Sequence, residues 1–151
     1  MGFRYKEAVE ICSRKRGILD SYYPATVLAA VGKNRYIVEY QTRYSDDKTR
    51  LLTAVVDGSE IRPSPPSIPV SNFAESDLVD AYLNGAWWTG RIARKVDPNY
   101  YVRLDCDGTE AHCAFYRVRL HLEWEGGEWL RPPANRLKMD GGEAKPNDRP
   151  S

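Results

Sequence analysis

The sequence contains one internal repeat, and this duplication limits the fold more than any other feature. Three short segments of the first half recur in the same order in the second half. Their offsets are nearly constant: 70 residues from Val9 to Val79, 65 from Tyr22 to Trp87, and 64 from Tyr36 to Tyr100. Each copy closes with an apolar residue followed by arginine, at residues 61–62 and 118–119. Because only loop lengths differ, we expect two copies of one structural unit.

The local patterns within each copy are those of β-strands. Residues 36–40, Tyr-Ile-Val-Glu-Tyr, alternate with a period of two, which is typical of a strand. Residues 32–34 and 105–108 contain the Gly, Asn and Asp of tight turns. Short helical turns are predicted near residues 57–61 and 116–120. Several short strands in so small a unit favour a strongly bent barrel.

A proline-rich segment, residues 61–70, separates the two copies. Its four prolines disfavour both a helix and a central strand. The predicted divisions are a first domain at residues 5–68, a second at 73–132 and a disordered, Gly- and Pro-rich tail at 133–151. Units this small are marginally stable alone, so we expect them to pack together. Trp124 and Trp129 are candidates for that contact.

Composition and charge exclude several classes of protein. Lys and Arg number 22 against 21 Asp and Glu, and a net charge of +1 argues against nonspecific DNA binding. No apolar run approaches the roughly 20 residues of a membrane span. Three cysteines cannot form a fully paired disulfide framework, which favours a reducing, intracellular location.

The order of these motifs resembles the Agenet domain, a plant-enriched branch of the Tudor-like ("Royal") barrel families. The motifs in the first copy are an aromatic pair before Pro-Ala-Thr-Val, the segment 36–40 and Ile-Arg-Pro-x-Pro-Pro; in the second copy they are Trp-Trp-x-Gly and a closing Gly-Glu-Trp. The resemblance covers roughly residues 5–132. It implies an all-β fold of two tandem Tudor-like barrels packed together.

The same resemblance implies a function. It indicates a noncatalytic chromatin reader in the nucleus that binds methylated lysine on the histone H3 tail. Dimethylated lysine 9, a mark of heterochromatin, is the preferred ligand on this interpretation.

Tyrosines of the first copy are the candidate binding residues. A methylated ammonium keeps its charge but loses hydration, so its best partner is a cage of electron-rich ring faces. The candidate cage residues are Tyr23, Tyr40 and Tyr44, and Tudor-like barrels commonly place a cage ring where Tyr23 precedes Pro24. Tyr22 is the alternative to Tyr23, because strand alternation directs one ring to the core and the other to the surface. The sequence does not decide between them.

The second copy lacks an equivalent cage. Leu104 stands where the first copy has Tyr40, and the following loop, residues 105–108, has no aromatic residue. Lysine reading is therefore assigned to the first domain, and the groove between the domains is expected to hold the rest of a basic peptide. The candidate acidic partners are Asp46, Asp47, Asp77 and Asp105.

Other functions remain open from sequence alone. One is nucleic-acid binding by the basic loop Arg14–Arg16 and surface tyrosines. Another is recognition of an unmodified or arginine-methylated peptide. Cys106, His112 and Cys113 match no familiar zinc spacing, and no catalytic motif is present. We therefore expect a monomer without metal, cofactor or enzyme activity. The lysine, its methylation state and the peptide direction are not specified by the sequence.

Overall fold

The computed structural model describes residues 2–15 and 18–132. The predicted tail at 133–151 and Arg16 of the basic loop lie outside these residues. Within them the chain is almost entirely antiparallel β-strand, with two single 3-10 turns and no α-helix. The predicted all-β class is confirmed. None of the described elements is a helix long and apolar enough to cross a membrane.

The first unit is a bent sheet of strands in the order β5-β1-β2-β3-β4. The strands are β1 (Ala8–Lys15), β2 (Ile18–Ala30), β3 (Arg35–Tyr44), β4 (Leu51–Asp57) and β5 (Ile61–Pro63). A 3-10 turn at Gly58–Glu60, within the predicted region 57–61, leads into β5. Its core consists mainly of Val, Ile and Tyr side chains, including Val38 and Tyr40.

The second unit repeats this order as β10-β6-β7-β8-β9. The strands are β6 (Leu78–Leu83), β7 (Ala86–Val96), β8 (Asn99–Leu104), β9 (Glu110–Cys113) and β10 (Val118–Leu120). The turn predicted near 116–120 is found at Phe115–Arg117, and β10 takes the remaining residues. A separate core contains Val79, Ile92 and Val102.

The strand registers confirm that the two units are copies. Ala25 pairs with Tyr40 in the first unit, and Gly90 pairs with Leu104 in the second. These pairs are related by the offsets of 65 and 64 residues found in the sequence. Leu104 is therefore the structural equivalent of Tyr40.

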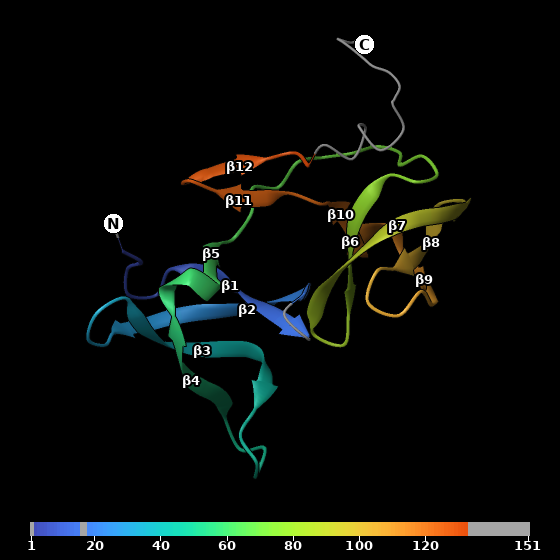
Figure 1. Ribbon diagram of the computed structural model, residues 1–151. Helices are drawn as coiled ribbons and strands as arrows, with labels where there is room; N and C mark the ends of the chain where they lie inside the picture. Colours follow the sequence, from blue (N-terminus) through green and yellow to red (C-terminus); the bar gives the residue numbers. More distant parts are fainter. Residues whose placement is uncertain (1, 16–17, 133–151) are drawn as a thin grey trace.

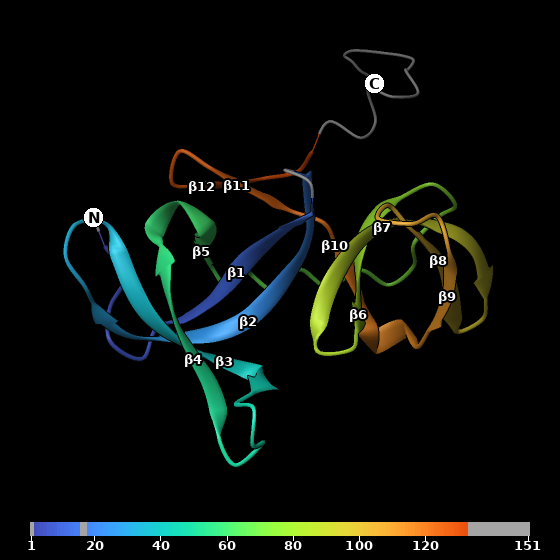
Figure 2. The same cartoon turned by 60° about the horizontal axis from the view of Figure 1, so that its bottom comes forward.

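The two units join through their longest strands. β2 pairs with β7, so that ten strands form one continuous sheet, and Figures 1 and 2 show the units on either side of this junction. Tyr22 lies opposite Trp87, and these two residues are equivalent positions of the repeat. The two copies therefore meet about an approximate twofold axis.

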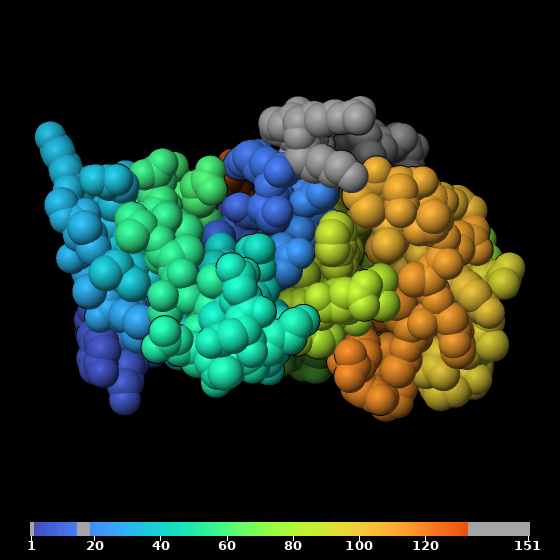
Figure 3. All heavy atoms as spheres, turned by 90° about the horizontal axis from the view of Figure 1, so that it is seen from below, coloured from blue at the N-terminus to red at the C-terminus, as the bar shows by residue number. Residues whose placement is uncertain are grey.

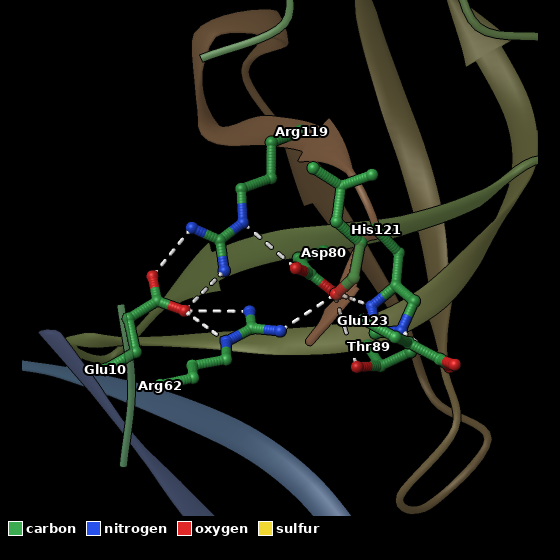
Figure 4. A network of polar contacts seen from close by, with 8 residues as sticks. Glu10, Arg62, Asp80, Thr89, Arg119, His121 and Glu123 are labelled. Atoms are coloured by element: carbon green, nitrogen blue, oxygen red, sulfur yellow. Dashed lines mark hydrogen bonds and ion pairs between the residues drawn. The ribbon is translucent and has the colours of Figure 1, made fainter. Parts of the chain in front are cut away.

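Buried charges surround this junction (Figure 4). Glu10 pairs with Arg62 at 2.8 Å in the first unit, and the equivalent residues Asp80 and Arg119 pair at 2.9 Å in the second. Arg119 also crosses to Glu10 at 2.8 Å, and His121 Nδ1 lies 2.7 Å from Asp80. We call the β2–β7 pairing together with these ions the inter-domain seam.

A terminal hairpin of the second unit covers the first. β11 (Glu123–Glu125) and β12 (Glu128–Leu130) lie above β1 and β5 in Figure 1. The rings of Trp124 and Trp129 face each other across the hairpin at 5.0 Å, and Trp129 lies 5.0 Å from the Arg62 guanidinium. Arg62 also donates a hydrogen bond to the Leu122 carbonyl at 2.8 Å. The segment containing both tryptophans thus contributes to the packing between units, as predicted.

Candidate functional site

Two of the predicted cage tyrosines form a corner at the first barrel. Tyr40 on β3 pairs with Ala25 on β2, and Tyr23 lies two residues before Ala25 on the same face of β2. The ring centroids of Tyr23 and Tyr40 are 6.2 Å apart, and the ring planes make an angle of 89°. Two perpendicular rings at this distance form adjacent walls of a box. We call this pair the ring corner.

Tyr22 faces the opposite side of β2 and belongs to the seam. Its side chain is 1% exposed, its ring lies 3.4 Å from the Arg62 guanidinium, and its centroid is 6.1 Å from that of His121. Burial raises the pKa of its phenol, and the charge of Arg62 offsets only part of this effect. The structure thus brings Tyr23, not Tyr22, to Tyr40.

Tyr44 lies at the end of β3, apart from the ring corner. Its side chain is 57% exposed, and it contacts no other aromatic ring among the described residues. Asp46, in the following loop, is also exposed. The structure therefore does not place Tyr44 against the two rings of the corner.

Asp47 stabilises the loop that follows β3. Its Oδ1 accepts hydrogen bonds from the Ser45 hydroxyl at 2.7 Å, the Thr49 hydroxyl at 2.7 Å and the Thr49 backbone N–H at 3.0 Å. These hydrogen bonds lower the pKa of Asp47 to about 2. Its carboxylate is therefore largely committed to the loop itself.

A cation already occupies the ring corner. The guanidinium carbon of Arg43 lies 5.1 Å from the Tyr23 ring centroid and 4.8 Å from that of Tyr40, both within cation–π range. Burial raises the pKa of the Tyr40 phenol, while the charge of Arg43 and its hydrogen bond to Tyr40 act in the opposite direction. Arg43 is a site residue that sequence reasoning missed.

Strand alternation explains why Arg43 was missed. Arg43 lies three positions after Tyr40, so a regular strand directs their side chains to opposite faces. The β3–β4 register shifts between Glu39 and Tyr44, which breaks this alternation. No residue in the segment identifies such an irregularity in advance.

The second unit has no ring corner at the equivalent position. Leu104 replaces Tyr40 and is 8% exposed within the core. Trp88, the equivalent of Tyr23, packs against the same core and donates its indole N–H to the Leu83 carbonyl at 2.9 Å. Trp87 is covered by the Arg119 guanidinium at 4.1 Å.

A groove of about 520 Å³ lies between the units on the Tyr22 side of β2. Both units contribute to it, and we call it the inter-domain groove. Its ionisable lining residues include Arg14, Arg62, Arg91, Asp105, His121, Glu123 and Glu125. Partial burial raises the pKa of Asp105, and the nearby charge of Arg91 counteracts this.

The other acidic candidate lies elsewhere. Asp77 accepts a hydrogen bond from the Ala74 backbone N–H at 2.9 Å and lines a separate pocket of about 340 Å³. The inter-domain groove shares no lining residue with the ring corner, because Tyr22 and Tyr23 face opposite sides of β2. The structure therefore does not gather the predicted acidic residues into one site.

Comparisons with known proteins agree with this architecture. Residues 6–66 match the model of the Agenet domain family. The solved structure of AGDP1 AGD34 from Arabidopsis thaliana superimposes with a TM-score of 0.81 and 27% identity, covering 86% of this chain and 90% of that one. The chain is a tandem Agenet domain. The solved ADCP1 tandem Agenet domain 3-4 gives a TM-score of 0.77 at 25% identity, over 86% and 88% of the two chains.

Longer Arabidopsis proteins contain similar sequences. Protein AGENET DOMAIN (AGD)-CONTAINING P1 is 33% identical over 125 residues, and DUF724 domain-containing protein 6 is 29% identical over 135. These matches cover 81% and 85% of this chain but 24% and 19% of the relatives. Agenet and Tudor-like domains are typically chromatin-associated modules that bind proteins or peptides, and they are generally noncatalytic.

Proposed function

We propose that this tandem Agenet domain is a noncatalytic nuclear reader of methylated lysine on the histone H3 tail, with dimethylated lysine 9 as the preferred mark. The observation that supports this most directly is the ring corner with a cation between its walls. Two perpendicular ring faces that already hold a guanidinium support a role in binding a methylated ammonium, which is also a weakly hydrated cation. The second unit, with Leu104 in place of Tyr40, supports the first rather than reading a second mark.

Two rings alone supply only part of the binding energy. Each ring face is worth about 0.5–2 kcal/mol to a cation, whereas micromolar affinity requires about −8 kcal/mol. We propose that Tyr44 closes over the ligand as a third wall. If the loop after β3 moves with Tyr44, the carboxylate of Asp46 would accept the remaining N–H of a dimethylated group, which a trimethylated group lacks.

The rest of the peptide must also contribute. The inter-domain groove carries three carboxylates, of Asp105, Glu123 and Glu125, among three arginines. We propose that these carboxylates bind the unmodified basic residues of a histone tail. Because β2 separates the groove from the ring corner, a peptide that uses both must cross the junction between the units. Binding of basic peptide residues in the groove is therefore independent of methyllysine binding at the ring corner and is tested separately.

Calorimetric titration with H3 peptides tests the reader function. The peptides are unmodified or mono-, di- or trimethylated at lysine 9, and we expect the dimethylated form to bind most tightly. Tyr23→Ala should weaken binding at least tenfold, while Tyr5→Ala, a change at an exposed tyrosine remote from the corner in sequence, should leave it unchanged. Affinity that does not depend on methylation would refute the proposal.

A second titration tests the groove. Asp105→Asn removes a charge from the groove without touching the ring corner. If the groove holds basic residues, this variant should bind the dimethylated peptide several-fold more weakly and retain its preference for methylation. Unchanged affinity would exclude the groove from peptide binding.

The nucleic-acid alternative makes an opposite prediction about salt. Arg14 is exposed and lines the inter-domain groove. Binding through phosphate contacts would fall steeply with added salt and with Arg14→Ala. Cage binding depends mainly on methylation, so titrations at two salt concentrations separate the two functions.

A further inference from the structure

We propose that Arg43 is an internal competitor that occupies the ring corner until a ligand cation displaces it. This inference rests on the proposed reader function. It goes beyond that function because it assigns a regulatory role to Arg43, a residue of β3 whose guanidinium lies against both rings of the corner.

The geometry places Arg43 where the ligand must bind. A ligand cation needs to lie within about 6 Å of the ring centroids. The Arg43 guanidinium carbon already lies 5.1 Å and 4.8 Å from the two centroids. Two cations cannot share a corner whose rings are 6.2 Å apart, so binding requires Arg43 to leave.

Displacement is possible because the guanidinium, at the tip of the Arg43 side chain, makes the contacts with the ring corner. These are two cation–π contacts and a hydrogen bond to Tyr40. The residue is exposed, lies at the open end of β3, and has a long, flexible side chain. Once released, its guanidinium is solvated by water. Tyr40, in contrast, is 6% exposed and packs in the core, so the corner persists when Arg43 leaves.

An internal competitor has a distinctive thermodynamic signature. It lowers the fraction of molecules with an open corner, and every ligand cation is affected by the same factor. Removing Arg43 should therefore strengthen binding of all methylation states equally and leave their ratio unchanged. Two cation–π contacts at an exposed site correspond to a gain of about 3- to 30-fold.

The experiment uses Arg43→Ala and Arg43→Gln, the second of which keeps chain length and polarity. The ligands are the dimethylated and trimethylated H3 peptides, measured by calorimetry, and tetramethylammonium, measured by NMR shifts of the tyrosine rings. Both variants should bind all three ligands more tightly by one common factor.

Arg50→Ala is the matched control. Arg50 is an exposed arginine at the end of the loop that follows β3, so its removal reproduces the loss of one positive charge. Any general electrostatic gain for a basic peptide appears in this control and diminishes at high salt. The gain from removing Arg43 should exceed it and persist at high salt.

The outcomes separate the two proposals. If the wild-type chain binds the methylated peptides, but both Arg43 variants bind equally tightly or more weakly, Arg43 is not a competitor and the reader function stands. Unequal factors for the three ligands also overturn the inference, because they indicate a direct contact with the ligand. If neither wild type nor variants bind methylated peptide or tetramethylammonium, the ring corner is not a cation site and both proposals fail.

Discussion

Tyr23 and Tyr40 form the same corner, but the fold depends on them to different degrees. Tyr40 belongs to the core of the first unit and is 6% exposed, whereas Tyr23 is half-buried at its edge. A loss of binding in a Tyr40 variant therefore has two possible origins. Separating them requires a substitution that keeps the ring.

We expect Tyr40→Ala to lower the free energy of unfolding by about 3 kcal/mol or more, as large-to-small changes of buried aromatic residues do. Tyr40→Phe retains the ring and its packing, so it should remain folded and bind methylated peptide. Urea unfolding and calorimetry measure the two effects. A fully stable Tyr40→Ala protein would show that the ring is not part of the core.

Tyr44→Ala, at an exposed position, should change the free energy of unfolding by less than about 0.5 kcal/mol.

At the scale of elements, the β6–β7 turn contacts the end of β3. Asn84 and Gly85 have φ angles of 52° and 80°, as a two-residue type I′ hairpin requires. The Thr42 hydroxyl on β3 donates a hydrogen bond to the Gly85 carbonyl at 2.6 Å. Figure 3 shows these two segments side by side on one face of the molecule. β3, which carries Tyr40 and Arg43, is thus held by the second unit.

Gly85→Ala should destabilise the protein for two reasons. A Cβ at Gly85 would lie 2.8 Å from the Thr42 Cβ, and the positive φ strains any other residue. Gly108 also has a positive φ, of 74°, but a Cβ there meets nothing within 4 Å. We expect a loss of about 2–3 kcal/mol for Gly85→Ala and about 1 kcal/mol for Gly108→Ala in chemical denaturation. Equal losses would mean that the contact with Thr42 contributes nothing.

The sequence was informative about elements and less so about their contacts. The repeat offsets identified Leu104 as the equivalent of Tyr40, because a duplicated barrel keeps its registers. The Asn84-Gly85 dipeptide, in contrast, is a sequence signal for a two-residue hairpin and was sufficient to predict the β6–β7 turn. The positions of Tyr22 and Arg43 were not predictable, since one depends on pairing between the units and the other on a register shift within β3.

At the scale of the whole molecule, buried charges join the two barrels. The repeated pair of an apolar residue and an arginine, at 61–62 and 118–119, was visible in the sequence. Its role was not, because charged residues usually lie at the surface. In the structure Arg62 is 3% exposed and Asp80 is fully buried. A buried charge that loses its ion-pair partner strongly destabilises the folded state, because its desolvation is no longer compensated.

Removing one partner from the seam should therefore be costly. Arg119→Met leaves Glu10 and Asp80 short of a partner, and we expect a loss of about 3–5 kcal/mol in the free energy of unfolding. Arg103→Met breaks the exposed Arg103–Glu110 pair and should cost less than about 1 kcal/mol. Denaturant titrations compare the two. Similar small losses would show that the seam ions do not hold the barrels together.

The seam should also make stability depend on acid. Burial raises the pKa of Asp80, but the hydrogen bond and charge of His121 and the charge of Arg119 outweigh it, so the net shift is downward. Because the Asp80 pKa is lower in the folded than in the unfolded protein, its carboxylate stabilises the fold. This stability is fully present above the ordinary carboxyl pKa of 3.8 and is lost progressively as pH falls through the lower pKa of the folded protein. Unfolding free energies measured between pH 5 and pH 2 should fall, and Asp80→Asn should flatten this slope. Asp47→Asn is the control, because it removes the separate contribution of the carboxylate in the loop after β3. A slope that Asp80→Asn leaves unchanged would show that Asp80 is not the source of the acid dependence.

The near-symmetry of the two barrels has a consequence for any chain that lies across them. Tyr40 and its counterpart Leu104 are related by the approximate twofold axis, yet only Tyr40 belongs to a ring corner. A symmetric receptor would accept a ligand equally well forwards or backwards. The two ends of this molecule differ, so an extended ligand that reached both barrels would be held with a single polarity.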